Sequence, residues 1–192
     1  KVIHWHCSKP EQVQSGEDTY GIDQWKQRVA ALQKLVEEKT ADLLTRNRDL
    51  EIESALERVR SVAMGMKKPE DMLVICKVIS KQLAGLGVKE IRNIQTAIFY
   101  TDRGIYTNYQ YYAKHDRTFI TDTDYTDHKV PRAFAARMQK GKGQLSVTHI
   151  KGRQQLKDWI AYQKGTNVFI DKYLGTADYL GYYWYSLGPV AM

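Results

Sequence analysis

Apolar residues recur at a fixed spacing through the first third of the chain. A seven-residue repeat is formed by Val29, Val36, Leu43 and Leu50. Residues 22–66 contain no proline, and Gly65 is their only glycine. Because apolar positions seven residues apart are typical of helices that pair in a coiled coil, the pattern predicts one helix over residues 22–66, about four times the mean helix length.

Polar residues fill the other core position of this repeat. If the apolar set takes position d, position a is held by Gln33, Thr40 and Asn47. A polar a layer lowers the stability of a coiled coil but fixes its register and disfavours larger assemblies. We therefore expect a homodimer held by a parallel coiled coil, with a seam formed by Val29, Gln33, Val36, Thr40, Leu43, Asn47 and Leu50. The alternative is a monomeric helix whose apolar stripe packs on the chain's own core.

The repeat changes phase after Leu50. The next apolar residues stay helically spaced but are displaced from the d series, and they include Ile52, Leu56 and Val59. Such a stutter changes the winding of a coiled coil locally. Together with the polar a layer, it leaves alternative registers close in energy, so that a helix pair can transmit a small movement.

Residues 67–192 change to short helical and strand patterns. Pro69 followed by two acidic residues is typical of a helix start, and Gly85 and Gly87 end this helix. Its expected buried face consists of Met72, Ile75, Cys76, Ile79 and Leu83. Two runs rich in aromatic and β-branched residues then flank residues 101–104, which predicts a β-hairpin with glycine at the turn.

The remaining elements complete the order of an α+β domain. We expect a long acidic loop over 114–129, a helix over 131–140, a strand over 144–150, a helix over 153–174 interrupted near Gly165, and one or two strands over 179–192. Helices followed by a hairpin and separate strands favour an antiparallel sheet flanked by helices. The predicted organisation is a connector over 1–21, the coiled-coil helix over 22–66 and the α+β domain over 67–192.

Composition adds a location and an expectation about the ends. The apolar runs are far shorter than the roughly 20 residues that cross a bilayer, so no membrane contact is expected. The only cysteines are Cys7 and Cys76, which excludes a disulfide framework and favours a reducing, cytoplasmic setting. Because the chain begins without Met at Lys1 and stops inside an apolar stretch, we expect a fragment of a longer protein, such as the cytoplasmic part of a receptor.

Positive charge is concentrated in the second part of the chain. Residues 1–66 carry ten Lys/Arg and eleven Asp/Glu, whereas residues 67–192 carry nineteen and eleven. Residues 129–157 contain eight cations and no acidic residue, and the candidate anion-binding residues among them are Arg132, Arg137, Lys140 and Lys142. A solvated basic face is the favoured interpretation, because no helix-turn-helix, nucleic-acid-binding or P-loop motif accompanies it. Anionic-ligand or nucleic-acid binding is the alternative.

Two groups of residues could in principle hold a metal. His4, His6 and Cys7 are suitable ligands for zinc or copper, but a strand remnant is the favoured interpretation, because nothing further along supplies an obvious fourth ligand. The expected acidic loop holds Asp116, Asp122, Asp124 and Asp127 between His115 and His128. A metal hydrolase could use such residues, but a solvated loop is the simpler interpretation. We expect no metal and no catalytic residues, because no nucleophile–base grouping or phosphoacceptor histidine box is visible.

One resemblance joins these features. "ESALERVRSVAMGMKKPEDM", continued by "VISKQLAGLGV", resembles the junction and opening of GAF-like sensory modules in multidomain bacterial sensor histidine kinases and cyclases of the Bacteroidetes type. "KLVEEKTADLLTRNRDLE" resembles the signalling-helix coiled coils that connect sensor and output domains. The resemblance covers residues 34–112, and the rest matches in element order only. It implies a GAF-like domain that is truncated at its C-terminus, since modules of this family continue with further strands and a closing helix.

The resemblance also implies where a ligand would bind. GAF-type modules hold small molecules between the sheet and its covering helices, and amphipathic aromatic side chains suit such a pocket. The tentative pocket residues are Tyr100, Tyr109, Tyr111, Trp159, Tyr183 and Trp184, although most aromatic residues of this region are expected in the core. The predicted function is a non-catalytic sensor that passes a ligand-dependent or conformational signal to an output domain, with no cofactor beyond an unidentified small molecule.

Overall fold

A computed structural model describes residues 16–187 and 190–191. The chain divides into two compact units, Lys1–Glu51 and Ile52–Met192. The candidate metal ligands His4, His6 and Cys7 lie outside the described residues, as does most of the predicted connector.

Helix α1 spans Gly16–Met64. The helix up to Glu51 belongs to the first unit, and its last turns belong to the second unit. The long helix predicted from the heptad repeat is therefore confirmed, with a start six residues earlier than expected. Ion pairs one turn apart stabilise it, including Arg46 with Asp42 at 3.2 Å. The apolar positions of the predicted seam are exposed in the single chain, at 62% for Val36, 60% for Leu43 and 63% for Leu50.

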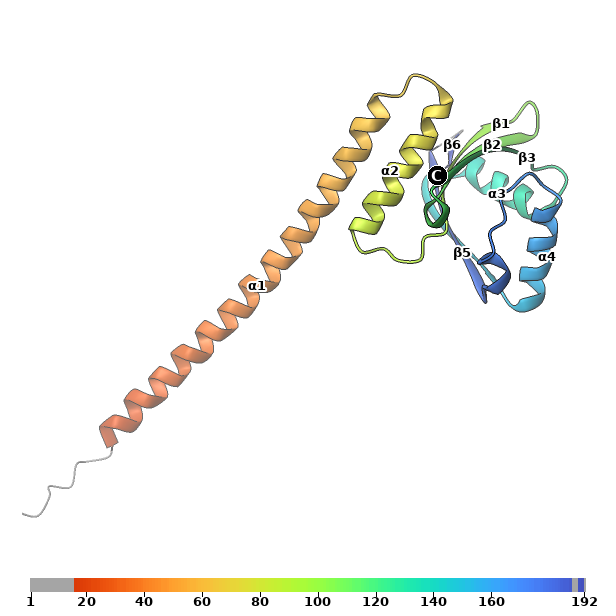
Figure 1. The fold of residues 1–192 in the computed structure, drawn as a ribbon. Coiled ribbons are helices and arrows are strands. Elements are labelled where there is room, and N and C mark those ends of the chain that lie inside the picture. The colour runs from red at the N-terminus through yellow and green to blue at the C-terminus, as the bar shows by residue number, and fades with distance from the viewer. Residues whose placement is uncertain (1–15, 188–189, 192) are drawn as a thin grey trace, which may run out of the picture. The chain divides into compact units, whose positions relative to one another are not determined.

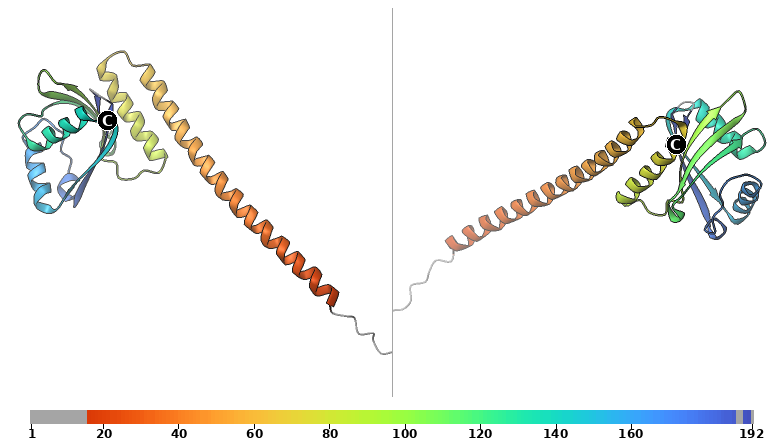
Figure 2. Two further views of the ribbon diagram at one scale, coloured as in Figure 1. Left: turned by 180° about the vertical axis from the view of Figure 1, so that it is seen from behind. Right: turned by 45° about the horizontal axis from the view of Figure 1, so that its top comes forward.

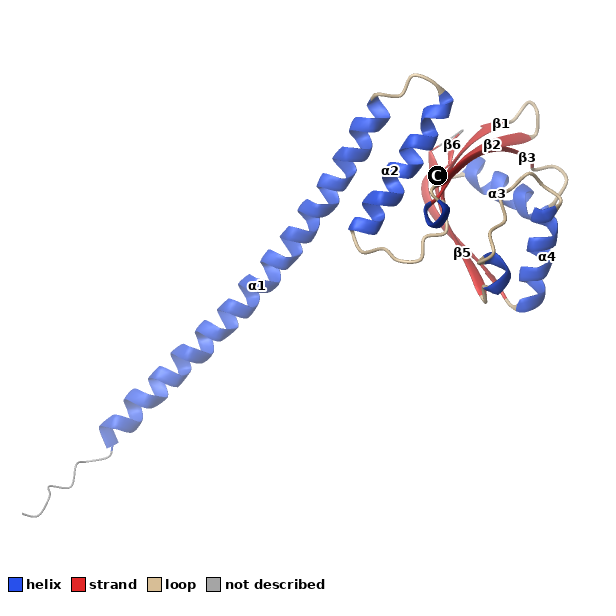
Figure 3. Cartoon of the chain, in the orientation of Figure 1, coloured by secondary structure: helices blue, strands red, loops and turns tan. Residues whose placement is uncertain are grey.

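The second unit is built on one antiparallel sheet in the strand order β3-β2-β1-β6-β5-β4. Its strands are β1 Ile94–Tyr100, β2 Ile105–Tyr112, β3 Arg117–Asp124, β4 Lys142–Lys151, β5 Tyr179–Leu187 and β6 Val190–Ala191. Its helices are α2 Met72–Gly85, α3 Lys129–Lys140 and α4 Arg153–Lys164, with 3₁₀ turns at Pro69–Asp71, Ala113–His115 and Leu174–Thr176. The predicted α+β class with a long N-terminal helix is confirmed (Figure 3).

Helices cover both faces of the sheet. Helix α2 lies on one face and α3 and α4 lie on the other, as Figures 1 and 2 show. On the α2 face, the buried Cys76 thiol donates a hydrogen bond to the Tyr109 carbonyl at 3.3 Å. On the opposite face, Phe134 and Met138 of α3 form a core with Phe99 and Tyr106 of the sheet. Since successive side chains of a strand point to opposite faces of the sheet, each strand contributes side chains to the packing on both faces.

The predicted hairpin is confirmed between β1 and β2. Tyr100 pairs with Ile105, so residues 101–104 form the turn. Gly104 has φ +67°, and a Cβ there would lie 2.9 Å from the Thr126 methyl group. Glycine is therefore required by backbone conformation and by space.

Two sequence predictions are corrected. The expected acidic loop contains strand β3, because Phe119, Thr121 and Thr123 alternate toward the sheet interior although aspartates occupy the other face. The expected helix over 153–174 ends at Lys164, where the peptide N–H of Gly165 bonds to the Tyr162 carbonyl at 3.0 Å. Within the described residues, no helix is long and apolar enough to cross a membrane.

Candidate functional site

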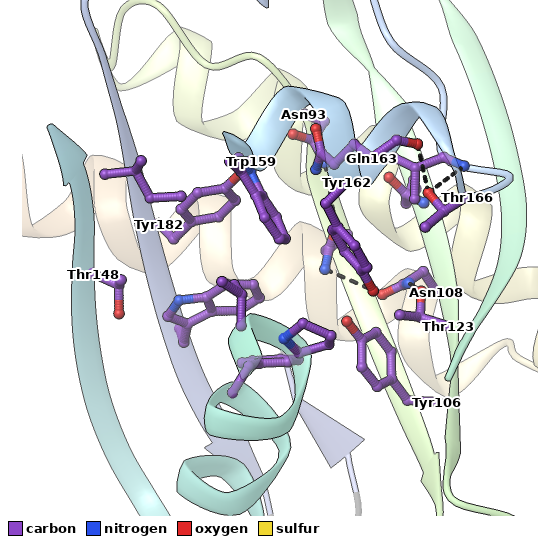
Figure 4. Close-up of a pocket in the computed structure, with 18 of the residues that line it drawn as sticks. Asn93, Tyr106, Asn108, Thr123, Thr148, Trp159, Tyr162, Gln163, Thr166 and Tyr182 are labelled. Carbon is purple, nitrogen blue, oxygen red and sulfur yellow. Dashed lines mark hydrogen bonds between the residues drawn. The ribbon is translucent and has the colours of Figure 1, made fainter. Parts of the chain in front are cut away.

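A cavity of about 450 Å³ lies on the sheet face that α3 and α4 cover (Figure 4). Its lining residues come from β1, β2 and β3, from α3 and α4, from β4 and β5, and from the segments that precede β1 and follow α4. A volume of this size falls in the range of roughly 300–1,000 Å³ that small-molecule sites occupy. All of these residues belong to the second unit.

Hydrogen-bonded polar side chains form the floor of the cavity. Gln95 of β1 donates to Asn108 at 3.2 Å, and Asn108 donates to Thr123 at 3.1 Å. Gln110 accepts a bond from the Tyr112 hydroxyl at 2.8 Å. These groups are uncharged and largely satisfy one another, so that the floor can meet a polar ligand without exposing a buried charge.

Aromatic rings form the walls. Trp159 of α4 donates its indole N–H to the Tyr182 hydroxyl at 2.7 Å. The Tyr182 and Trp184 rings are stacked at 5.3 Å and 7°, and the Trp159 and Tyr162 rings are stacked at 5.3 Å and 23°. Each pair presents flat apolar surface of the kind on which another planar ring stacks.

The lining tyrosines stay uncharged near neutral pH. Burial raises the pKa of Tyr106, although a hydrogen bond with Thr123 opposes the rise. Burial also raises the pKa of Tyr182, and hydrogen bonds from Trp159 and Gln163 oppose it. Low-dielectric surroundings disfavour a phenolate, so these hydroxyls add no negative charge to the cavity.

Positive charge lines the cavity, and among the described lining residues no acidic side chain opposes it. Lys129 and Arg137 are exposed residues of α3, and Arg137 donates to the Thr148 hydroxyl at 2.9 Å. The third cation, Arg92, is paired with the buried Asp171 at 3.2 Å. The uncompensated charge therefore lies on the solvent-exposed α3 side of the cavity.

Gln163 contributes an acceptor that has no partner. Its residue is 7% exposed and lines the cavity from α4. Among the described residues, its Oε1 and the His115 Nε2 are the buried side-chain polar atoms without a hydrogen bond. Buried polar groups are almost always paired, so these two atoms are exceptions within the second unit. No family model, curated protein or solved structure matches the chain.

Two of the six predicted pocket residues line the cavity. These are Trp159 and Trp184. The assignment is corrected for Tyr109 and Tyr111, which alternate onto the α2 face of β2, and for Tyr183, which is 70% exposed on β5. Tyr100 lies at the end of β1, where Arg103 stacks on its ring at 4.4 Å. The sequence showed the strands but not which alternating face each ring would occupy.

The predicted anion-binding residues are not all brought together. Arg137 lines the cavity, whereas Arg132 donates to the Thr126 carbonyl, and Lys140 is an exposed residue at the end of α3. The side chain of Lys142 lies outside those that the structure describes. Lys129 joins Arg137 instead. Lys129 and Arg137 are separated in the sequence, but both lie on the side of α3 that lines the cavity.

Three aspartates of the expected loop, Asp116, Asp122 and Asp124, bond to neighbouring side chains. Lys77 donates to Asp116 at 2.6 Å, and Tyr111 donates to the same carboxylate at 3.0 Å. Thr107 donates to Asp122 at 2.6 Å across the strand pair. The described residues contain no group of three or more His, Cys, Asp or Glu side chains that could hold a metal ion.

The amide residues of the floor were not anticipated from the sequence. Gln95, Asn108 and Gln110 are two residues apart or directly paired, so they share one face of the hairpin. The available signal in the sequence was the alternation of Asn and Gln within segments of otherwise β-forming residues, because amide side chains are rare in strands. Gln163 gave no signal, since a single glutamine near the end of a helix is ordinary.

Proposed function

We propose that the chain is a non-catalytic sensory module of a bacterial signalling protein, GAF-like in character, acting in the cytoplasm. In this proposal the second unit binds a small molecule in its cavity. Helix α1 pairs with a second copy and passes the change to an output domain of the same protein. The observation that carries the proposal is the cavity between the sheet and helices α3 and α4, with flat aromatic walls and an amide floor.

The composition of the cavity favours a ligand over an imperfectly packed core. A core defect in a protein is apolar and small, because interiors pack densely. This cavity instead contains polar side chains from three strands and exposed cations. A few placed polar groups among apolar and aromatic ones are typical of small-molecule sites.

A continuous set of contacts within the second unit supports a route from the cavity to α1. Gln95 and Asn108 face the cavity, and their neighbours Thr96 and Tyr109 face α2 through Cys76. Helix α2 is in turn joined to the last turns of α1, where Arg58 donates to Gln82 at 3.1 Å. A shift of strands β1 and β2 on ligand binding would therefore reach α1 through one layer of packing.

The exposed stripe of α1 supports pairing with a second copy. The d-position side chains of Val36, Leu43 and Leu50 remain in solvent in the single chain, which is unfavourable unless another molecule covers them. The polar residues at position a would keep such a pair adjustable rather than locked. The anionic-ligand alternative is compatible with the same cavity, because Arg137 and Lys129 line it.

Thermal shift measurements with a panel of cellular metabolites test the proposal on the whole chain. Ala133 and Ala136 are both exposed residues of α3, but only Ala133 lines the cavity. We expect a metabolite that raises the melting temperature of the wild type and of Ala136→Trp, but not of Ala133→Trp, in which indole fills the cavity. Equal stabilisation of both variants, or no stabilising metabolite, would contradict the proposed function.

A further inference from the structure

We infer that strand β4 is a docking edge for an extended acidic segment of a partner protein, which adds one more strand to the sheet. In this arrangement the backbone of the segment bonds to β4. Its apolar side chains lie beside Leu145 and Val147, and its carboxylates meet the cations at the two ends of β4. The inference goes beyond the proposed function, because it requires neither a ligand in the cavity nor a pair of α1 helices.

Strand β4 is the last strand on one side of the sheet, so one of its edges is open. The strand order is β3-β2-β1-β6-β5-β4, and among the described residues β4 pairs with β5 alone. In an antiparallel pair, alternate residues direct their peptide N–H and C=O groups away from the neighbouring strand. Along the ten residues Lys142–Lys151, these groups form a row to which a further strand can bond.

The face of β4 and β5 opposite the cavity is apolar and uncovered. Thr148 and Ile150 of β4 line the cavity, so Leu145 and Val147, which alternate with them, point to the other face. Helix α2 lies on that face, but it packs on β1 and β2, and Leu145 remains 66% exposed. Exposed apolar faces of this kind are typical of interaction sites. Its exposed residues are Leu145, Val147, Tyr183, Tyr185 and Leu187.

Tyrosine side chains extend this face toward the open edge. Tyr183 pairs with Val147, and Tyr185 pairs with Leu145. The Tyr185 hydroxyl lies 3.7 Å from the position that a Cβ would take at Gly143, so the Tyr185 side chain reaches from β5 over β4. Tyrosine combines flat apolar surface with a polar tip, and it is enriched where proteins bind one another.

Cations at both ends of β4 favour an acidic partner. Lys142 and Lys151 are its first and last residues, and residues 143–150 contain no Lys, Arg, Asp or Glu. Lys140 and Arg153 flank the strand and are exposed. Within the part of the chain that the structure describes, no ion pair includes Lys140, Lys151 or Arg153. Opposite charge on a partner would therefore steer it to this edge.

The same charges argue against a second copy of the chain at this edge. Antiparallel pairing of two β4 strands over their whole length would place Lys142 opposite Lys151 at both ends, and directly opposed like charges destabilise a strand pair. The other edge strand, β3, carries Asp122 and Asp124, which would repel an acidic segment. An acidic strand is therefore expected to select β4.

Fluorescence anisotropy with labelled ten-residue peptides tests the inference on the whole chain. The first peptide alternates valine with glutamate, and the second alternates valine with lysine. The third contains valine and glutamate in blocks of two, so that neither face of its strand is apolar. At low salt we expect the first peptide to bind with a dissociation constant below about 1 mM, and the other two at least about tenfold more weakly. Hydrogen exchange should show protection of β4 amides by the first peptide.

Two pairs of variants identify the contacts. Leu145→Thr should weaken binding of the first peptide by about fivefold, because apolar contact is lost while threonine still suits a strand. Ile120→Thr, at an exposed position of the other edge strand, is the matched control. Lys151→Glu should weaken binding by about fivefold as well. Lys67→Glu makes the same change at an exposed position between α1 and α2 and should have no effect.

Several results would overturn the inference. These are failure of the first peptide to bind at millimolar concentration, equal binding of the lysine peptide, and a complex in which β4 amides stay unprotected. Self-association of the chain that blocks the peptide would place a second copy at this edge instead. Should Leu145→Thr or Lys151→Glu fail to fold, the three peptides on the wild type decide the same point. Each of these results leaves the metabolite test of the cavity with Ala133→Trp unchanged, so the proposed function stands or fails separately.

Discussion

Arg92 donates a hydrogen bond from Nε to the buried carboxylate of Asp171 at 3.2 Å. The same guanidinium donates to the Phe169 carbonyl at 3.2 Å and lies 5.1 Å from the centre of the Tyr112 ring. Arg92 precedes β1, while Asp171 belongs to the segment between α4 and β5. This pair therefore fixes the segment that follows α4 against the sheet beside the cavity.

Breaking this pair should lower the stability of the second unit. In Asp171→Ala, the half-buried Arg92 charge keeps its desolvation but loses its carboxylate, and Asp171 also accepts a bond from the Leu174 peptide N–H at 3.0 Å. We expect the free energy of unfolding to fall by about 2–3 kcal/mol, measured by urea denaturation. Asp178→Ala, at an exposed position of the same segment, should change it by less than about 0.5 kcal/mol. Equal effects of the two changes would contradict the assigned role.

The Lys77–Asp116 pair predicts a pH-dependent contribution to stability. The hydrogen bond from Lys77 holds the pKa of the Asp116 carboxyl below its ordinary value of 3.8. Because the pKa of Asp116 is lowered in the folded protein, the contribution of the pair to stability is fully present above pH 3.8. This contribution is lost as the pH falls through the lowered pKa of the folded protein. We expect Asp116→Asn to reduce the melting temperature at pH 7, with a difference that shrinks as the solution is acidified below 3.8.

Asparagine is the appropriate replacement at this position. Asp116 has φ +44°, a left-handed conformation that asparagine also adopts readily. Backbone strain should therefore be unchanged, and the charge alone is tested. Asp102→Asn, in the exposed β1–β2 turn, is the control. A difference that stays constant from pH 7 to strongly acidic solution would show that the ion pair is not its source.

The Cys76 thiol should be unreactive in the native protein. It is fully buried against β1 and β2, and burial raises its pKa above the ordinary 9.0. Thiolate formation is required for labelling, so labelling of a Cys7→Ser variant at pH 8 should proceed only as fast as the domain opens. We expect a rate that rises steeply with urea. Rapid labelling in native buffer, at the rate of the unfolded chain, would contradict the position of α2 on the sheet.

Replacing a polar residue of the predicted seam should strengthen the helix pair. Asn47 occupies position a, and Asn47→Leu removes a polar layer from the interface, so the melting temperature of the dimer should rise. Thr45→Leu places the same side chain two residues away on the expected outer face and should leave the dimer unchanged. Sedimentation equilibrium and melting at several concentrations measure both. A monomeric wild type, or a loss above about 1 kcal/mol in Asn47→Leu, contradicts the assigned seam.

Elements with a strong local pattern could be predicted from the sequence. The helix over α1 follows from a repeat that lasts four heptads without proline, and the hairpin follows from Gly104 between two β-forming runs. Strand β3 was mistaken for a loop because Asp122 and Asp124 lower the β-propensity of its outer face. Asp122 accepts a bond from Thr107 of the paired strand, which only the folded sheet provides, whereas Asp124 accepts local bonds from Thr126 two residues later.

The cavity could be predicted only in part. Trp159 and Trp184 were expected to line it because large amphipathic rings suit a pocket between sheet and helices. Gln95, Asn108 and Gln163 were missed, since their roles depend on which face of a strand or helix is turned inward. Which face is turned inward depends on the packing of α2 on one side of the sheet and of α3 and α4 on the other. The local spacing of residues along the sequence does not contain this information.

The most direct measurement is the set of tryptophan indole N–H signals in ¹H–¹⁵N spectra of the whole chain, recorded during titration with the metabolite that stabilises the wild type and Ala136→Trp but not Ala133→Trp. Trp159 and Trp184 line the cavity, whereas Trp25 lies on α1 in the first unit. Single Trp→Phe variants assign the signals. We predict that the Trp159 and Trp184 signals shift and saturate with this metabolite and that Ala133→Trp abolishes the shift. Unchanged signals from both residues, with the metabolite at a saturating concentration, would contradict a ligand site in this cavity.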